Sequence, residues 1–236
     1  MAVLTWDAEG NRLYETGTSQ GVLYKFDTTN NTYGTGVAWN GLTAVTESPS
    51  GADETAMYAD DIKYLSLRGI EEFGATIEAY TYPEEFAECD GSATLTDGVY
   101  AGQQTRVKFG FSFKSIVGND NAGNDYGYKL HIIYGATASP SERSYATVND
   151  SPEAITFSWE VTTNPVKFTH NGKTLSTSCI TIDSTKLAEA KRANLAKLEE
   201  FLYGRNADQA QSIEALDPHL PTPEQVLSLI ENGTAA

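Results

Sequence analysis

TRVKFGFSFKSI, residues 105–116, is the stretch that decides the fold. Every second side chain from Val107 onward is apolar, because Phe109, Phe111 and Phe113 continue the series. Successive side chains of a β-strand point to opposite sides of a sheet, so these four share one face. The other face carries Gly110 together with Arg106, Lys108, Ser112 and Lys114. The pattern predicts a strand with one dry face.

Seven further stretches have the same aromatic and β-branched character and are separated by Gly, Asn, Asp, Ser and Pro. Short runs of this kind, bounded by turn residues, are typical of strands. The predicted strands are residues 21–26, 37–46, 57–69, 73–82, 128–137, 154–163 and 176–183. We therefore expect a mainly β fold, a sandwich or barrel, over residues 1–183.

Two interruptions between these strands have their own character. Residues 46–60, TESPSGADETAMYAD, are too polar and too rich in Pro, Gly and acidic side chains for a core, which predicts a long projecting loop or hairpin tip. Residues 83–90 begin with Pro, continue with two Glu and precede Gly91, which predicts a short helix beside the strands.

The period changes after residue 183, where we expect a C-terminal helical segment, residues 184–236. Leu187, Leu195, Leu198 and Leu202 fall on one side of a helix that ends at Gly204. We expect this leucine stripe to dock on the outer side of the β-core.

A second helix is predicted near the end of this segment. Thr222 can cap it, Pro223 fits its first turn, and Gln225 can complete a capping box. Val226, Leu229 and Ile230 give it an apolar stripe.

Composition excludes several classes of protein. The 236 residues carry a formal net charge of −16 at pH 7, so the overall field of the molecule repels nucleic acid. No apolar run approaches the roughly 18 residues of a membrane span, and the start of the chain lacks the pattern of a secretory signal. We expect no membrane contact and synthesis in a cytoplasm, with Cys89 and Cys179 reduced.

The motifs of catalysis occur here only in unsuitable contexts. Residues 17–21, GTSQG, fit a nucleophile elbow, but a strand pattern follows where a helix is required, so we interpret them as a turn. His131, His170 and His219 lack the spacing of a zinc signature. Residues 118–125 lack the closing Glu of a calcium loop and are typical of a Gly/Asn turn. The sequence predicts no enzyme, no cofactor and no metal site.

Several stretches form one characteristic series: residues 71–91 (EEFGATIEAYTYPEEFAECDG), 102–113 (GQQTRVKFGFSF), 118–166, 12–24 (RLYETGTSQGVLY), 36–51 and 220–230 (LPTPEQVLSLI). This series resembles the major tail protein of bacteriophages with long, non-contractile tails, especially those of Gram-positive hosts. The resemblance covers roughly residues 6–231.

The resemblance implies a tail-tube subunit of the virion, made in the bacterial host. Its copies would assemble as hexameric rings that stack into a hollow tube for genome passage, in contact with tape measure, distal tail and tail terminator proteins. In this family a long loop between two early strands bridges successive rings. Residues 46–60 match that loop, and the candidate inter-ring residues are Ser48, Pro49, Ser50, Gly51, Ala52, Asp53 and Glu54.

A tube for DNA must let the duplex slide. DNA presents a charge about every 1.7 Å of axis, so a basic wall would hold it and an acidic wall leaves it mobile. The candidate lumen-facing residues are Glu47, Asp53, Glu54, Asp60, Asp61, Glu71, Glu72 and Glu78. The alternative interpretation is that these are only solubilising surface charges.

Two other function classes stay open from the residues alone. One is an aromatic-rich binding module for a carbohydrate or cell-wall ligand, with Trp6, Trp39, Trp159 and exposed tyrosines as stacking platforms. The other is a hydrolase with two separated carboxylates, for which no spacing in the sequence gives support.

Overall fold

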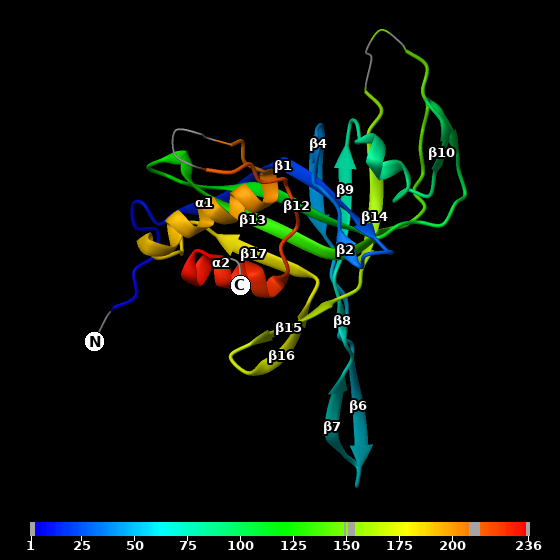
Figure 1. Ribbon diagram of the computed structural model, residues 1–236. Helices are drawn as coiled ribbons and strands as arrows, with labels where there is room; N and C mark the ends of the chain where they lie inside the picture. The colour runs from blue at the N-terminus through cyan, green and yellow to red at the C-terminus, as the bar shows by residue number, and fades with distance from the viewer. Residues whose placement is uncertain (1–2, 149, 151–153, 208–212, 235–236) are drawn as a thin grey trace.

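The computed structural model describes residues 3–148, 150, 154–207 and 213–234 (Figure 1). The main sheet contains β1 (Leu13–Asp27), β2 (Thr32–Tyr33), β3 (Val37–Trp39), β4 (Leu42–Glu47), β9 (Gly74–Ala79), β12 (Phe109–Asn119), β13 (Gly123–Ala138), β14 (Phe157–Thr163) and β17 (Cys179–Asp183). Its order is β2-β1-β12-β13-β14-β9-β4, with β3 also paired to β1 and β17 to β13, and every pairing is antiparallel.

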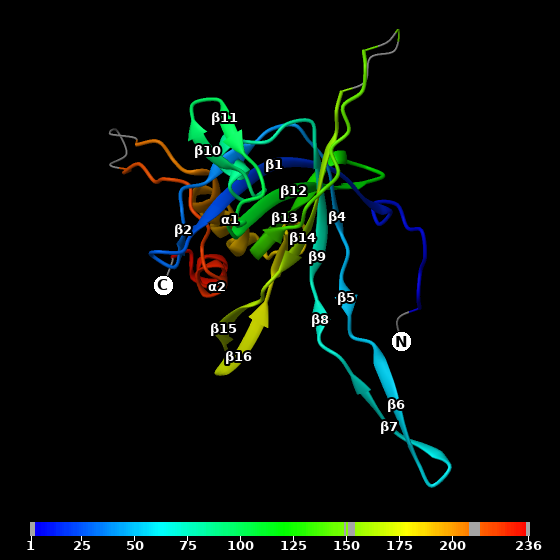
Figure 2. The same ribbon diagram turned by 90° about the vertical axis from the view of Figure 1, so that its right-hand side faces the viewer.

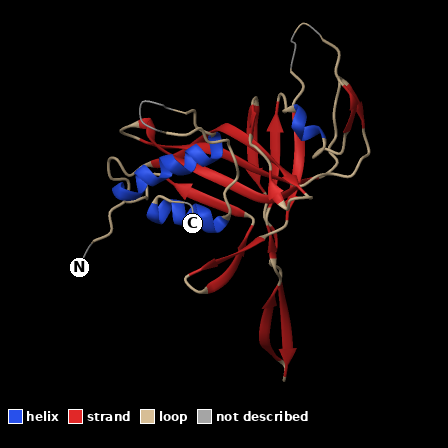
Figure 3. Cartoon of the chain, in the orientation of Figure 1, coloured by secondary structure: helices blue, strands red, loops and turns tan. Residues whose placement is uncertain are grey.

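Four two-stranded hairpins or ribbons leave this sheet (Figure 3). They are β5 (Ser50–Gly51) with β8 (Glu71–Glu72), β6 (Glu54–Ala59) with β7 (Ile62–Arg68), β10 (Ala93–Thr96) with β11 (Val99–Ala101), and β15 (Val166–His170) with β16 (Lys173–Thr177). The helices are η1 (Glu84–Ala87), α1 (Glu189–Tyr203) and α2 (Pro223–Asn232). The mainly β class with C-terminal helices is confirmed.

Both faces of β12 are buried, although the expected alternation is present. Phe109, Phe111 and Phe113 lie in one core. On the opposite face, Ser112 is fully buried against the Tyr24 hydroxyl at 3.3 Å, and Lys114 pairs with Glu199 of α1 at 2.7 Å. The prediction of a single dry face is therefore wrong, because polar partners on the neighbouring strand and helix satisfy the polar residues of the second face.

The main sheet bends where β13 changes partner. Residues 129–133 of β13 pair with β17, whereas residues 136–138 pair with β14. Between them Gly135 has a φ of 61°, and β13 carries an extra residue opposite β12. A Cβ atom on Gly135 would lie 2.3 Å from the carbonyl oxygen of Asn164. Glycine is required here, and beyond it β14, β9 and β4 form a second layer.

The first core lies between the two layers of the bent sheet. Trp39, Phe86 and Trp159 form its centre, with ring centroids of Trp39 and Trp159 5.5 Å apart and those of Phe86 and Trp159 5.1 Å apart. Aromatic pairs at these separations and tilts add to the stabilisation from burial alone. The described strands form a sandwich of this kind and do not close into a barrel.

The second core lies between β1, β12, β13 and β17 and the two C-terminal helices (Figure 1). Leu195, Leu198 and Leu202 of α1 are buried there, and Leu187 packs against them from outside the helix, which confirms the predicted docking. The Tyr24 hydroxyl donates to the carbonyl of Leu202 at 2.7 Å, so the end of α1 is tied to the sheet.

The short helix α2 is as the sequence predicts. The Thr222 hydroxyl accepts from the Gln225 amide, and the Gln225 side chain accepts from the amide of Thr222, which completes the capping box. Val226 and Leu229 are buried against the second core.

Two local expectations change and one is confirmed. Residues 17–21 form no turn between strands but lie inside β1, where Gly17 and Gln20 adopt φ of 70° and 52° and shift the pairing with β12. The predicted helix 83–90 is a single 3₁₀ turn, Glu84–Ala87. Residues 118–125 do form the turn between β12 and β13, with two backbone amides donating to the Asn119 side chain.

The two cysteines form no disulfide. Burial raises the pKa of the Cys89 thiol to about 12 and that of Cys179 to about 11. No helix of the described chain is long and apolar enough to cross a membrane.

Candidate assembly surfaces

Residues 48–73 form a long β-hairpin, here called the arm, that projects from the second layer of the sheet (Figure 2). Its outgoing side is β5 and β6, and its return side is β7 and β8. The predicted loop 46–60 is therefore only the outgoing half of a hairpin. Thr46 and Glu47 belong to β4 in the body, and residues 62–72 supply the return half, of which 62–69 were predicted as part of a separate strand, 57–69.

The turn at the tip of the arm consists of Asp60 and Asp61. Both have positive φ, 51° and 64°, and the pair Ala59 and Ile62 flanks them. Two central residues of positive φ are characteristic of the type I′ turn, whose twist matches that of the strands it joins. Asp tolerates this conformation better than most residues, which explains how the arm reverses without glycine.

The arm has one apolar face. Residues directly opposite each other in an antiparallel pair share a face, and here Met57 is paired with Leu65, Thr55 with Leu67 and Ala59 with Ile62. Met57, Ile62, Leu65 and Leu67 are 47, 63, 38 and 57% exposed. An isolated two-stranded hairpin is only marginally stable in water, so this face requires a covering surface.

The other face of the arm carries an ion-pair cluster beside the exposed Tyr58, which is paired with Lys63. Glu54 accepts from the Lys63 ammonium at 2.6 Å and lies 3.9 Å from the Arg68 guanidinium. The hydrogen bond from Lys63 lowers the pKa of Glu54. The charges on this face are thus partnered within the arm.

The candidate inter-ring residues form the base of the arm and not its tip. Ser48 donates from its amide to the Gly74 carbonyl at 2.8 Å, and Ala52 donates to the Ile70 carbonyl at 3.2 Å. At Gly51, with φ of 80°, a Cβ atom would lie 2.4 Å from the Ile70 carbonyl oxygen. The base is therefore a closely paired ribbon that continues the strands of the body.

Six of the eight candidate lumen-facing acidic residues lie on the arm: Asp53, Glu54, Asp60, Asp61, Glu71 and Glu72. Glu47 is on β4 and Glu78 on β9, where Glu78 lies on the face opposite the buried Ile77 and Ala79. The structure thus brings six of them into one element, while their position relative to a lumen stays a prediction.

The apolar face of the arm is not visible in the predicted strand 57–69. Residues 57–69 were predicted as one strand, so their apolar side chains were distributed over both faces of a sheet. The available signal was symmetry: Met57 and Leu65 flank the Asp60–Asp61 pair at nearly equal distances, as hairpin partners do.

The end of the molecule opposite the arm carries the β10–β11 hairpin (Figures 1 and 2). Leu95 and Val99 of this hairpin are exposed. Nearby, Asp90 forms ion pairs with Arg106 and Arg143 through a carboxylate that is mostly buried. The Arg143 guanidinium also lies 5.5 Å from the ring centroid of Tyr82. The ion pairs of Asp90 and the contact between Arg143 and Tyr82 thus hold together the segments that flank the exposed hairpin.

His131, one of the three histidines that lack the spacing of a zinc signature, has the contacts of a packed side chain. Its ring is stacked on Phe113 at 4.5 Å, and its nitrogens contact the hydroxyls of Ser115 at 2.9 Å and Thr181 at 3.3 Å. The Glu47 carboxylate is 3.7 Å from Nδ1, beyond hydrogen-bond distance. Burial lowers the pKa of His131.

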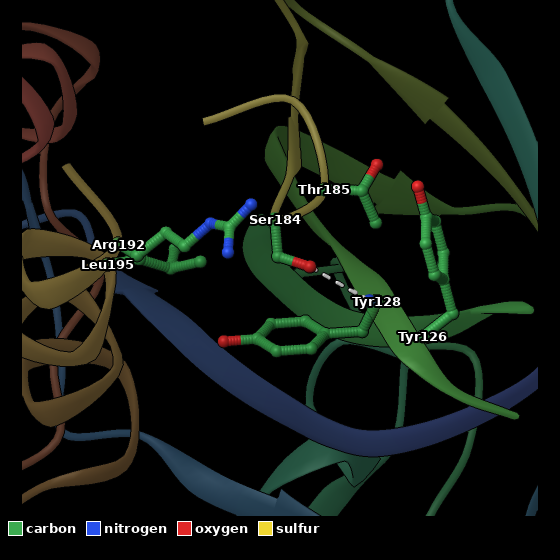
Figure 4. Close-up of a pocket in the computed structure, with 6 residues that line it drawn as sticks. All are labelled: Tyr126, Tyr128, Ser184, Thr185, Arg192 and Leu195. Carbon is green, nitrogen blue, oxygen red and sulfur yellow. Dashed lines mark hydrogen bonds between the residues drawn. The ribbon is translucent and has the colours of Figure 1, made fainter. Parts of the chain in front are cut away.

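A cavity of about 380 Å³ lies between α1 and the N-terminal part of β13 (Figure 4). Arg192 extends from α1 toward Ser184, whose hydroxyl accepts from the Tyr128 amide at 2.9 Å. The lining comprises Tyr126, Tyr128, Ser184, Thr185, Arg192 and Leu195, none of which is a carboxylate, imidazole or thiol. Among the described residues, no group of His, Cys, Asp and Glu could hold a metal ion.

The binding-module alternative loses two of its three tryptophan platforms, while Tyr58, Tyr64 and Tyr145 are exposed as it expects. Trp39 and Trp159 are 3% and 1% exposed in the first core, and the Trp39 indole donates to the Thr81 carbonyl at 2.9 Å. Only Trp6 of the three is exposed. The interpretation of Trp39 and Trp159 as ligand platforms is wrong, because they hold the two sheet layers together.

The chain matches no protein-family model, and no curated protein matches it in sequence. Among solved structures, one chain of the 6-fold symmetrised anti-feeding prophage baseplate matches with a TM-score of 0.36 and 7% identity, over 78% of this chain and all of that one. A chain of the extended PVC sheath-tube complex, an extracellular contractile injection system, matches with a TM-score of 0.29 and 12% identity, over 67% of this chain and 88% of that one. At these low scores the matches establish no shared function.

Proposed function

We propose that this chain is the structural subunit of a bacteriophage tail tube, as its sequence resemblance implies. Its copies would polymerise as stacked, hexameric rings around an acidic channel for the genome. The role requires no turnover and no cofactor. The other tail components implied by the resemblance, the tape measure, distal tail and tail terminator proteins, would contact the same polymer in the virion.

The arm is the observation that carries the proposal. It exposes a face of large apolar side chains at the end of a paired ribbon, and nothing in the described chain covers that face. Fully burying one such side chain contributes about 1.5–3 kcal/mol, and packing these four, which are 38–63% exposed, on another molecule would supply part of that value for each. An element of this kind is suited to joining subunits.

The edges of the sheet support lateral contacts between copies. Within the described residues, β4 pairs only with β9 and β17 pairs only with β13, so each has an outer edge without a strand partner. Unpaired edges present amide and carbonyl groups that a strand of another chain can pair with. Repeated pairing that closes on itself would give a ring.

The test is assembly with and without the arm. In an arm-excised variant, Asn-Gly replaces residues 53–69 and joins Ala52 to Ile70, which are already hydrogen-bonded at 3.2 Å. We expect wild-type protein to form rings and tubes in negative-stain micrographs at high concentration, and the excised variant to stop at subunits or single rings with an unchanged melting temperature.

The matched control keeps the arm and changes only its tip, Asp60→Asn with Asp61→Gly, which preserves the type I′ turn. This control should assemble as the wild type does. Tubes of normal length from the excised variant, or a wild-type chain that stays monomeric with its partner proteins present, would overturn the proposal. Tight retention of duplex DNA by the tubes in physiological salt would refute the acidic channel.

A further inference from the structure

A cleft of about 310 Å³ lies between η1 and the β10–β11 hairpin, which stand side by side at the end of the molecule opposite the arm (Figures 1 and 3). Its volume is at the lower end of the range of small-molecule sites, about 300–1,000 Å³. Two aromatic rings and four polar or charged side chains line it: Tyr82, Tyr100, Glu84, Asp90, Ser92 and Arg143. This mixed lining suits a polar organic ligand.

The two tyrosines of the cleft are held in place. The ring of Tyr82 packs edge-on against Phe157 and Trp159, with ring centroids 5.3 and 5.5 Å away, so the first core fixes it. Tyr100 of β11 is 48% exposed, and its hydroxyl donates to the Glu84 carboxylate at 3.0 Å, which links the hairpin to η1. A site whose walls are already ordered costs a ligand less conformational entropy on binding.

The charges of the cleft cancel. The Asp90 carboxylate, 10% exposed, forms ion pairs with Arg106 and Arg143. Together with Glu84 these groups carry two negative and two positive charges, so their formal sum is zero. An ionic ligand would have to break a mostly buried ion pair or bring in a charge without a partner, and both cost free energy. The cleft therefore favours an uncharged ligand.

The polar groups of the cleft keep capacity for further hydrogen bonds. A carboxylate offers about four acceptor sites, and the Tyr100 hydroxyl occupies one of those on Glu84. Arginine has several N–H donors, of which the ion pair with Asp90 engages only part in Arg143. The Ser92 hydroxyl can both donate and accept. The cleft thus offers donors, acceptors and aromatic faces to one ligand.

We propose that this cleft binds a neutral sugar, stacked on the Tyr100 ring and hydrogen-bonded to Glu84 and Arg143. A pyranose carries hydroxyls around its rim and C–H groups on its faces, which is the complement of this lining. The buried Ala87 supplies a small apolar floor. A single sugar ring offers few atoms for contact, so we expect millimolar affinity. This activity is additional to the proposed structural role and does not rest on it, because the cleft lies within one subunit.

The experiment is saturation-transfer difference NMR on dilute full-length protein. The probes are glucose, galactose and N-acetylglucosamine, and the control is sorbitol, which has the hydroxyls of a sugar but no ring. We expect transfer to the ring C–H protons of at least one sugar at millimolar concentration, and none to sorbitol. Absence of transfer to all three sugars, or equal transfer to sorbitol, would overturn the proposal.

Substitutions of tyrosine locate the bound sugar. Tyr100→Ala removes the stacking ring and should weaken binding at least tenfold, whereas Tyr100→Phe keeps the ring and should retain binding within fivefold. Tyr126→Ala removes a tyrosine of similar exposure, 40%, on β13 and should leave binding unchanged. Unchanged binding in Tyr100→Ala, or an equal loss in Tyr126→Ala, would overturn this assignment. A loss in Tyr100→Phe as large as in Tyr100→Ala would refute the stacking.

Glu84→Gln tests whether the ligand is neutral, because glutamine keeps an acceptor oxygen and removes the charge. Binding should stay within threefold of the wild type, and a tenfold loss would show that the cleft recognises a cation instead. Glu84 and Tyr100 are both exposed, so circular dichroism and thermal melting of these variants should match the wild type. Wild-type tubes that bind none of the sugars would overturn this inference alone, and a sugar-binding chain that never assembles would refute only the tail-tube proposal.

Discussion

Replacing Gly135 by alanine tests the bend that gives the molecule its two sheet layers. Gly135 has a φ of 61°, and an alanine there is strained by about 1–2 kcal/mol. Its Cβ would also lie 2.3 Å from the Asn164 carbonyl oxygen, and relieving such an overlap costs about 1–3 kcal/mol. The Asn164 amide donates back to the Gly135 carbonyl at 3.0 Å, so the two backbones cannot separate without losing this bond. The expected loss is about 2–5 kcal/mol of unfolding free energy.

Gly123 provides the matched control for this prediction. Its φ is 58°, yet a Cβ atom there would meet nothing within 4 Å. Gly123→Ala therefore reports the backbone strain alone, about 1–2 kcal/mol. Urea unfolding of dilute protein measures both variants, with the fluorescence of the buried Trp39 and Trp159 as the signal. Equal losses in the two variants would refute the reasoning, because the close approach to Asn164 would then cost nothing.

Three further predictions concern the helices, the histidine and the end of the molecule that carries the β10–β11 hairpin. Leu198→Ala should cost about 2–5 kcal/mol of unfolding free energy because Leu198 is fully buried. Its control, Leu175→Ala at an exposed site, should cost under about 0.5 kcal/mol. Equal losses for the two variants in urea titrations would place Leu198 outside the core. Burial lowers the pKa of His131, so this residue binds a proton more readily in the unfolded chain than in the folded one. The free energy of unfolding should therefore be highest above about pH 6.5, the ordinary pKa of histidine, and should decrease on acidification. His131→Asn should flatten this part of the profile, and parallel profiles for the variant and the wild type would contradict that assignment. Asp90→Ala removes the shared partner of Arg106 and Arg143 and should speed protease cleavage near β10–β11. The control, Asp97→Ala at an exposed position, should not change cleavage. Identical digestion patterns for the two variants would show that the ion pairs of Asp90 do not hold the hairpin in place.

Local patterns with a direct physical meaning could be predicted from the sequence. The alternation through Phe113 identifies β12, and Thr222 with Gln225 identifies the start of α2, because in each case neighbouring residues alone determine the geometry. The leucine stripe ending at Leu202 likewise identifies α1 and its buried side.

Features that depend on distant partners could not be predicted. Ser112 and Lys114 look solvent-exposed in sequence, but Tyr24 and Glu199 from other elements satisfy them in the interior. Gly17 and Gln20 in the first half of β1 have positive φ, and the sequence around them resembles a turn. The strand continues through them because β12 pairs with β1 on both sides of the two register shifts.

The candidate assembly site was predicted in part. The polar outgoing half of the arm is visible in composition, since its Pro, Gly and acidic residues exclude it from a core. Its apolar face appears only once Met57 and Leu65 are paired across the strands, and that register depends on a turn of two aspartates which lacks the usual Asn-Gly signature.

The raised pKa values of Cys89 and Cys179 have a practical consequence for following assembly. At neutral pH fewer than about one in a thousand of these native sulfur atoms is in the reactive ionised form. A cysteine introduced at an exposed position such as Ser66 would therefore react with a maleimide dye much faster than Cys89 or Cys179 does. Energy transfer between donor- and acceptor-labelled molecules could then report the spacing of neighbouring subunits in a native background, without a cysteine-free parent.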